Sequence, residues 1–206
     1  MSREPIHILL TSFGPFPDVP VNRTQRLVEA LGKLSDDRPD LILHTATLET
    51  VWDKAPAAVA ALHARLSPRI AVHFGVAEDA LGIELERAAY NFCDGSPDAD
   101  GCMPDEGELM PGVGAQLQTR LALSDAIAAL HRAGVTATIS DDPGRYLCNA
   151  VYHRSLVEAA RAPERTDALF VHVPAEPSVP GPGDVEILRG LRALIDWLAA
   201  EAHATA

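Results

Sequence analysis

Three kinds of side chain near the ends of predicted strands are those needed for nucleophilic catalysis by a thiol. Cys148 lies in SDDPGRYLCN, where a turn leads from a strand into the first turn of a helix. Free N–H groups and the positive end of the helix dipole favour a thiolate there and would face an oxyanion. His172 in ALFVHVP and either Glu84 or Glu86 in IELER could supply a general base and the carboxylate that orients it.

Each of these residues also has a purely structural interpretation. A buried cysteine packs as a small hydrophobic residue, a histidine on an apolar strand is often a satisfied core residue, and two glutamates at i and i+2 can form a solvated strand edge. The residue types therefore suggest a thiol, an imidazole and a carboxylate acting together, and the geometry stays open.

A second candidate site is the turn SFGPFPDVPVN after the first predicted strand. Phe13 and Phe16 lie three residues apart in a Gly/Pro-rich loop, and Asn22 is placed to cap the following helix. The two rings either pack into the core or clamp a flat apolar ligand.

Short apolar runs alternate along the chain with segments of helical periodicity. Strands are predicted over 6–11, 41–47, 70–74, 135–139 and 168–173, and helices over 22–34, 54–66, 114–132, 146–161 and 184–201. This alternation indicates one α/β domain over residues 1–206, with an open, twisted, mostly parallel sheet and helices on both faces. Ligands of such sheets bind at the carboxyl ends of the strands, where the candidate residues lie.

The region 81–114 departs from this alternation. Ile83 and Leu85 alternate with Glu84 and Glu86, which predicts a strand with two different faces. The following segment, 93–112, is acidic, and we interpret it as a solvated flap. A calcium loop formed by Asp98, Asp100, Asp105 and Glu106 is the alternative, but their spacing does not match a known ligand loop.

The composition narrows the classes of partner. The 206 residues include 17 Lys and Arg and 29 Asp and Glu, a formal charge of −12. This charge repels phosphate backbones and anionic lipid, so neither nucleic acid nor a membrane is an expected partner. Three cysteines make no disulfide framework, and neither a signal-peptide pattern nor an apolar run of about 20 residues is present, so we expect a cytoplasmic protein.

The chain shows no pattern typical of a metal or cofactor site. Cys93 and Cys102 have no histidine pair nearby, and the eight histidines form no HxH, HxxxH or HExxH motif. Neither GxGxxG nor GxxxxGK[ST] is present. We therefore expect no metal and no cofactor.

Four motifs in chain order resemble those of the pyroglutamyl peptidase I family, the cytosolic pyrrolidone-carboxylate peptidases, which are cysteine peptidases. The family's G-F-x-P-F-G-G…N segment is similar to LLTSFGPFPDVPVN, and its E-R-x-A-x-N is similar to ERAAYN. Its S-x-x-A-G-x-Y-x-C-N is similar to SDDPGRYLCN, and its F-x-H-V-P to FVHVP. The length also agrees, so the resemblance covers essentially the whole chain.

The resemblance implies a role for each candidate residue. Cys148 would be the nucleophile, His172 the base and Glu86, rather than Glu84, the orienting carboxylate. The implied pocket for the lactam ring consists of Phe13, Phe16 and Asn22, with Thr50 and Tyr146 nearby. Aromatic faces and a few amide hydrogen bonds suit an uncharged lactam ring.

The chain departs from the family pattern at several positions. The altered residues are Pro17 and Asp18 in the first loop, Val76 after the H-x-G turn, Ser96 where the family commonly has arginine, and Pro143 before Gly144. The arginine is a candidate oxyanion donor, and the loss of one such donor costs roughly 3 kcal/mol of transition-state stabilisation. Arg87 and Arg145 are the candidates to replace it.

We therefore predict a cysteine omega peptidase that removes an N-terminal pyroglutamyl residue from small peptides through a thioester. The alternatives are a weak or inactive lactam-binding homologue and a cysteine amidohydrolase of altered specificity. The resemblance also implies a homo-oligomer, for which the apolar flap residues Leu109, Met110 and Val113 are candidate contacts.

Overall fold

The described residues form eight short strands and five α-helices, which alternate as expected for the α/β class except over residues 70–118, where four strands follow one another. The computed structural model describes residues 4–15, 22–104, 107–175 and 182–205. Its strands are β1 (Ile6–Phe13), β2 (Leu41–Leu48), β3 (Ile70–Ala77), β4 (Ile83–Glu86), β5 (Ala88–Tyr90), β6 (Gln116–Gln118), β7 (Ala137–Ser140) and β8 (Asp167–Pro174). Its helices are α1 (Arg23–Gly32), α2 (Ala55–Leu66), α3 (Leu123–Arg132), α4 (Leu147–Arg161) and α5 (Asp184–Ala204), with a 3₁₀ turn at Lys33–Asp37.

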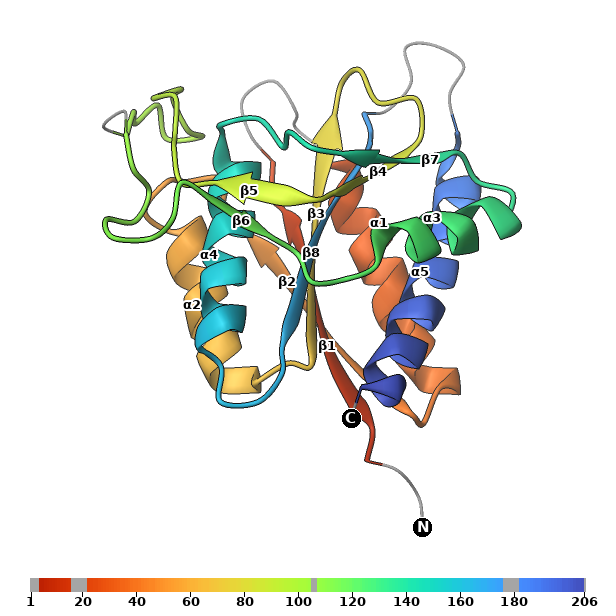
Figure 1. The fold of residues 1–206 in the computed structure, drawn as a ribbon. Coiled ribbons are helices and arrows are strands. Elements are labelled where there is room, and N and C mark those ends of the chain that lie inside the picture. Colours follow the sequence, from red (N-terminus) through yellow and green to blue (C-terminus); the bar gives the residue numbers. More distant parts are fainter. Residues whose placement is uncertain (1–3, 16–21, 105–106, 176–181, 206) are drawn as a thin grey trace.

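The main sheet has six strands in the order β2-β1-β3-β8-β4-β7. The pairs β1–β2, β1–β3, β3–β8 and β4–β7 are parallel, and β4–β8 is antiparallel. The prediction of a mostly parallel sheet is confirmed. Because β1, β3 and β8 run in the same direction, their carboxyl ends, at Phe13, Ala77 and Pro174, lie at one edge of the sheet (Figure 1).

Helices cover both faces of the sheet, which explains the continuous apolar runs of the central strands. In Figure 1, α2 and α4 lie on one side and α1, α3 and α5 on the other. Side chains of β1 divide between two buried clusters: Ile8 and Leu10 pack toward the side of α1, α3 and α5, and Leu9 and Phe13 toward the side of α2 and α4. The candidate site lies on the α2 and α4 side.

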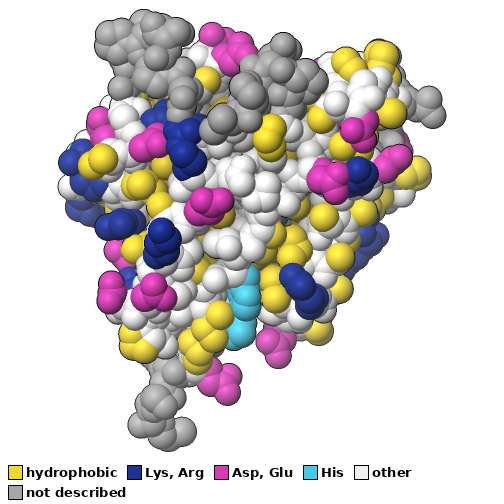
Figure 2. Space-filling model, turned by 180° about the vertical axis from the view of Figure 1, so that it is seen from behind, with side chains coloured by type: hydrophobic (Ala, Val, Ile, Leu, Met, Phe, Trp, Pro, Cys, Tyr) yellow, Lys and Arg dark blue, Asp and Glu magenta, His cyan; other side chains and the backbone are white. Residues whose placement is uncertain are grey.

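Two surface properties follow from the described residues. On the face shown in Figure 2, acidic and basic side chains are interspersed. No described helix has the length and apolar character that a membrane span requires.

The predicted helix over 114–132 was too long. It begins only at Leu123, and Gln116–Gln118 forms β6 instead, antiparallel to β5. Leu123, Ala126 and Leu130 are buried, whereas the side chains of Gln116 and Gln118 are exposed. Pairing with the backbone of β5 decided the structure of this segment, and that partner is not visible from local periodicity.

The acidic flap folds onto the body of the protein, and the interpretation as a solvated segment was wrong for Asp98. This residue is 4% exposed, and its carboxylate accepts hydrogen bonds from the N–H groups of Trp52, Asp100 and Cys102. Burial works to raise the pKa of Asp98, but these hydrogen bonds outweigh it and lower the pKa. The oxygens that a calcium loop would need are used within the chain, and Asp105 and Glu106 lie outside the described residues.

Candidate active site

Cys148 lies in the first turn of α4, at the edge of the sheet where β1, β3 and β8 end. The turn before the helix contains Gly144, whose φ of 78° is in the left-handed region that glycine tolerates. The N-cap residue, Tyr146, is extended and makes no side-chain hydrogen bond to the helix. The first-turn N–H groups beside the half-buried thiol are therefore not occupied by a capping side chain.

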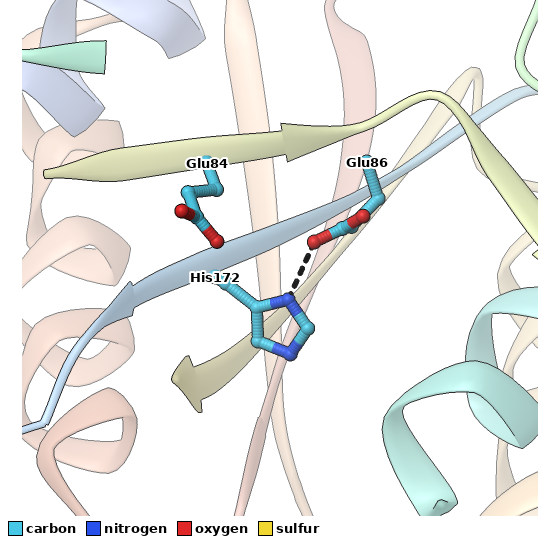
Figure 3. Close-up of side chains that lie close together, drawn as sticks. All are labelled: Glu84, Glu86 and His172. Atoms are coloured by element: carbon cyan, nitrogen blue, oxygen red, sulfur yellow. Dashed lines mark hydrogen bonds and ion pairs between the residues drawn. The ribbon is translucent and has the colours of Figure 1, made fainter. Parts of the chain in front are cut away.

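His172 comes from β8 and is held by a short hydrogen bond to Glu86. Its Nδ1 lies 2.6 Å from Glu86 Oε1, and both residues are buried, at 6% and 0% exposure (Figure 3). The ring also packs against Phe170, with ring centroids 4.8 Å apart. The bond to Glu86 assigns the proton to Nδ1 and leaves Nε2 for another partner.

Cys148 is that other partner. Burial by itself would lower the pKa of His172, but hydrogen bonds and charge interactions with Cys148 and Glu86 raise it to about 10. A thiol, an imidazole and a carboxylate are thus linked in one hydrogen-bonded row. The raised pKa favours an imidazolium ion at neutral pH.

Glu86 is fixed by its own surroundings as well as by His172. It ends β4, and the hydroxyl of Tyr152 in α4 donates to its carbonyl oxygen at 2.9 Å. Its second carboxylate oxygen, Oε2, is buried and has no hydrogen-bond partner among the described residues. Glu86, and not Glu84, makes the hydrogen bond to the imidazole.

Gly75 was missed by the sequence analysis and is needed for the thiol to fit. It is the register partner of His172 on β3. A Cβ atom at this position would lie 3.0 Å from Cys148 Sγ and 2.9 Å from the Phe170 ring. The H-x-G pattern was visible in the sequence, but only the packed structure shows what the missing side chain leaves room for.

The residues expected to bind a lactam ring are distributed around this edge of the sheet. Phe13 is buried at the end of β1, Asn22 is buried at the start of α1, and Thr50 is buried between β2 and α2. Tyr146 immediately precedes α4. Phe16 lies outside the described residues, as do Pro17 and Asp18.

Asn22 and Thr50 are engaged with the backbone. Asn22 Oδ1 accepts from Thr24 N at 3.0 Å and from Thr24 Oγ1 at 2.7 Å, which makes it the N-cap of α1. Its Nδ2 and the Thr50 hydroxyl both donate to the carbonyl oxygen of Gly14, at 3.4 Å each. Both side chains therefore anchor the end of β1, and a contact of either with a ligand stays a prediction.

Tyr146 and Trp52 hold the loop that contains Ser96. The Tyr146 hydroxyl donates to the Pro97 carbonyl at 3.0 Å, and Trp52 Nε1 donates to the Ser96 carbonyl at 2.8 Å. The two rings meet edge to face at 5.3 Å. Burial, with the charges of Asp98 and Cys148, raises the pKa of Tyr146. Trp52 was not anticipated, because nothing in its local sequence points to this loop.

The two candidate replacements for the family's arginine are both engaged with aspartates. Arg87 Nε donates to Asp141 Oδ1 at 2.6 Å. Arg145 pairs with Asp142, and its guanidinium lies over the Tyr90 ring, 3.8 Å from the centroid. Both guanidinium groups are already paired with a carboxylate, so the N-terminus of α4 is the better source of oxyanion donors.

One cluster of the described residues has ligand atoms close enough for a cation: Glu84, Glu86 and His172, within 4.8 Å of one another. Both ring nitrogens of His172 are already engaged, one with Glu86 and the other with Cys148. Hydrogen bonding accounts for the positions of Glu86 and His172, and we interpret the cluster as an acid–base group.

A sizeable cavity lies away from this site. A cavity of about 590 Å³ lies at the opposite end of the sheet, between the start of β1 and the end of α5, with His7, Arg69 and His203 in its lining. It is remote from the carboxyl edge, where ligands of open α/β sheets bind.

An open α/β sheet with a thiol at a helix N-terminus, an imidazole and a buried carboxylate defines a peptidase or amidase of the cysteine type. The comparisons with known proteins identify which one. The family model for pyroglutamyl peptidase matches residues 6–182. The chain therefore belongs to the pyroglutamyl peptidase family, as its motifs predicted.

Individual relatives agree with this assignment. The chain is 30% identical to the pyrrolidone-carboxylate peptidase of Pyrococcus furiosus over 171 residues, which cover 82% of this chain and 81% of the relative. It is 31% identical to mouse pyroglutamyl-peptidase 1, covering 92% of this chain and 88% of the relative. A solved mutant of the P. furiosus pyrrolidone carboxyl peptidase superposes with a TM-score of 0.87 at 27% identity, over 95% of this chain and 99% of the other.

The contact at Gly75 leads to a prediction for the site. We expect Gly75→Ala to lower kcat/KM by about 100-fold or more, because a methyl group would displace the thiol and a shift of about 1 Å costs that much. The fold should survive with a loss of about 1–3 kcal/mol, typical of one extra methyl group in a packed core. Steady-state kinetics and urea denaturation would measure the two effects.

Gly114→Ala is the matched control, because a Cβ there meets only one atom, at an ordinary 3.7 Å. Its kinetics should be those of the parent. Full activity in Gly75→Ala would show that the thiol does not depend on this gap.

Proposed function

We propose that the protein hydrolyses the amide bond after an N-terminal pyroglutamyl residue, with Cys148 as nucleophile, His172 as acid and base, and Glu86 as orienting carboxylate. The observation that carries the proposal is the hydrogen-bonded row formed by these three residues at the carboxyl edge of the sheet. Membership of the pyroglutamyl peptidase family supports the choice of substrate.

The reaction follows from the positions of the protons. The Cys148 thiolate attacks the pyroglutamyl carbonyl carbon, and the imidazolium of His172 gives its proton to the departing amine, which leaves a thioester. A water molecule then loses a proton to His172 and attacks the thioester, which releases the Cys148 thiolate and pyroglutamic acid; the acid loses its proton to solvent, and the thiolate–imidazolium pair is restored. Glu86 accepts the Nδ1 hydrogen bond throughout and keeps Nε2 directed at the reacting atoms.

The N-terminus of α4 is the proposed oxyanion site. Its first-turn N–H groups lie beside Cys148, and Tyr146 does not cap them through its side chain. Each tetrahedral intermediate places a negative oxygen next to the attacked carbon, within reach of such donors. This arrangement supplies donors where the family commonly uses the arginine that Ser96 replaces.

The proposed ring pocket lies between the end of β1 and Tyr146. Phe13 packs in the buried cluster behind the end of β1 and supports the apolar wall of this pocket, and Tyr146 lies two residues before the nucleophile. Asn22 and Thr50 hold the backbone of Gly14, which borders the pocket. A lactam ring without a charged amine matches such surroundings.

The activity is tested by hydrolysis of a fluorogenic pyroglutamyl amide by the purified protein under reducing conditions. Prolyl, alanyl and glutaminyl amides serve as matched substrates that differ in the first residue. Turnover of the pyroglutamyl amide alone is the expected result. A well-folded protein that cleaves only another amide would be an amidohydrolase of altered specificity, and one that cleaves none would be a binding homologue.

We also propose that the protein is a cytoplasmic homo-oligomer. Its family membership and the sequence pattern support this. The flap residues Leu109, Met110 and Val113 are partly exposed and remain the candidate contacts of such an interface. Light scattering on the purified protein would give the number of subunits.

A further inference from the structure

A second carboxylate, that of Glu84, lies beside the imidazole of His172. Glu84 and His172 are direct cross-strand partners in the antiparallel β4–β8 pair. Carboxylate oxygens of Glu84 and Glu86 and a ring nitrogen of His172 lie within 4.8 Å of one another. Figure 3 shows both carboxyl groups extending from β4 toward the histidine.

Glu84 is not held in place by another cation. Its side chain is half-buried, and among the described residues its carboxylate has no hydrogen bond or salt bridge. Burial and the neighbouring Glu86 raise the pKa of Glu84, and His172 works against this rise. The imidazolium is therefore the positive charge with which Glu84 interacts.

The titratable groups that face His172 come from α4, β3 and β4. From α4, Cys148 faces the ring, and the Tyr152 hydroxyl is bonded to the Glu86 backbone. From β3, Gly75 is the register partner and the nearby His73 is uncharged, because burial lowers its pKa to about 3. From β4, Glu84 and Glu86 are the two anions.

We propose that Glu84 is a positioning residue whose carboxylate extends, toward higher pH, the range in which the Cys148–His172 pair is charged and reactive. This inference rests on the proposed roles of Cys148 and His172. Glu84 would be a second anion beside the hydrogen-bonded row, and it would not contact the substrate.

The direction of the effect follows from the charge. An anion about 5 Å from an imidazolium stabilises its protonated form, so removing that anion lowers the pH at which the proton is lost. Because Glu84 is half exposed, water screens the interaction, and we expect a shift of about 0.5–1 pH unit.

The test measures the rate at which iodoacetamide alkylates Cys148 as a function of pH, with the product identified by peptide mass spectrometry. This readout requires no substrate, so it is independent of whether the pyroglutamyl activity exists. Cys102→Ser is the background, because Cys102 is exposed and would react, whereas Cys93 is buried. The basic limb of this profile is the inflection at which His172 loses its proton and leaves a free thiolate. Glu84→Gln should move this limb to lower pH by about 0.5–1 pH unit.

Two variants separate this role from a general change in charge or folding. Glu84→Asp retains the anion, so the shift in its basic limb should be at most half of the shift in Glu84→Gln. Glu29→Gln removes the same charge from an exposed position on α1, across the sheet, and should leave the profile unchanged. The proposal is overturned if Glu84→Gln has the profile of the parent, or if Glu29→Gln shifts the basic limb as much as Glu84→Gln does. If Glu84→Gln does not fold, Glu84→Asp alone decides. A basic limb that moves to lower pH by the full 0.5–1 pH unit in Glu84→Asp, which keeps the anion, also overturns the proposal.

Discussion

Replacing Cys148 by alanine is expected to lower kcat for a pyroglutamyl amide by a factor on the order of 10⁶, as happens when the nucleophile of a hydrogen-bonded catalytic group is removed. Neither His172 nor Glu86 can substitute, because neither lies at the N-terminus of α4, the proposed oxyanion site. The half-buried thiol is small, so the variant should unfold within about 1 kcal/mol of the parent. Single-turnover and steady-state assays would measure the loss.

Cys102→Ala is the matched control for this variant. Cys102 is exposed and far from the hydrogen-bonded row in the sequence, so its replacement should leave kcat and KM unchanged. Residual turnover within tenfold of the parent in Cys148→Ala would exclude a thioester mechanism.

Replacing Glu86 by glutamine is expected to lower kcat by about 10⁴-fold, the effect seen when the orienting carboxylate of such a row becomes an amide. The amide can donate from its NH₂ group to Nδ1, which favours the tautomer with the proton on Nε2, so that Nε2 can no longer accept a proton. Loss of this anion also removes a cause of the raised pKa of His172, so the basic limb of the pH profile should move downward.

A comparison of two glutamates makes this prediction specific. Glu84→Gln removes the same charge from the same strand without breaking the 2.6 Å hydrogen bond, and it should retain most of kcat at neutral pH. Equal losses in the two variants would mean that charge alone, and not the tautomer held by Glu86, governs the reaction. Circular dichroism of both variants would verify that β4 is intact, because Glu86 is fully buried.

Much of the fold could be predicted because its strands are buried on both faces. The runs around Ile8, Val72 and Val171 are apolar on both faces and too short for helices, and their alternation with amphipathic helices implies parallel connections. The same pattern placed the candidate residues at strand ends. It failed at 116–118, where the edge pairing with β5 depends on a segment more than 20 residues earlier in the chain.

The polar residues of the flap were harder to interpret. A run of acidic side chains normally faces water, and most of this one does. Asp98 does not, because the N–H groups of Trp52, Asp100 and Cys102 surround its carboxylate. One of these three donors comes from a different loop, so local composition could not reveal the buried anion.

By itself, the sequence determined the kind of chemistry: a cysteine at a helix start, a histidine at a strand end, and motifs shared with one peptidase family. Only the tertiary structure decided how these groups meet. The strand order places Glu86 on β4 beside His172 on β8, and the packing of α4 against β3 and β8 brings Cys148 to them. The tertiary structure also decided that Gly75 opens the space for the thiol and that Glu84 lies across from the imidazole. Local periodicity encodes which face of an element is buried, whereas distances between residues far apart in the chain depend on register and packing, which are settled only when the whole sheet forms.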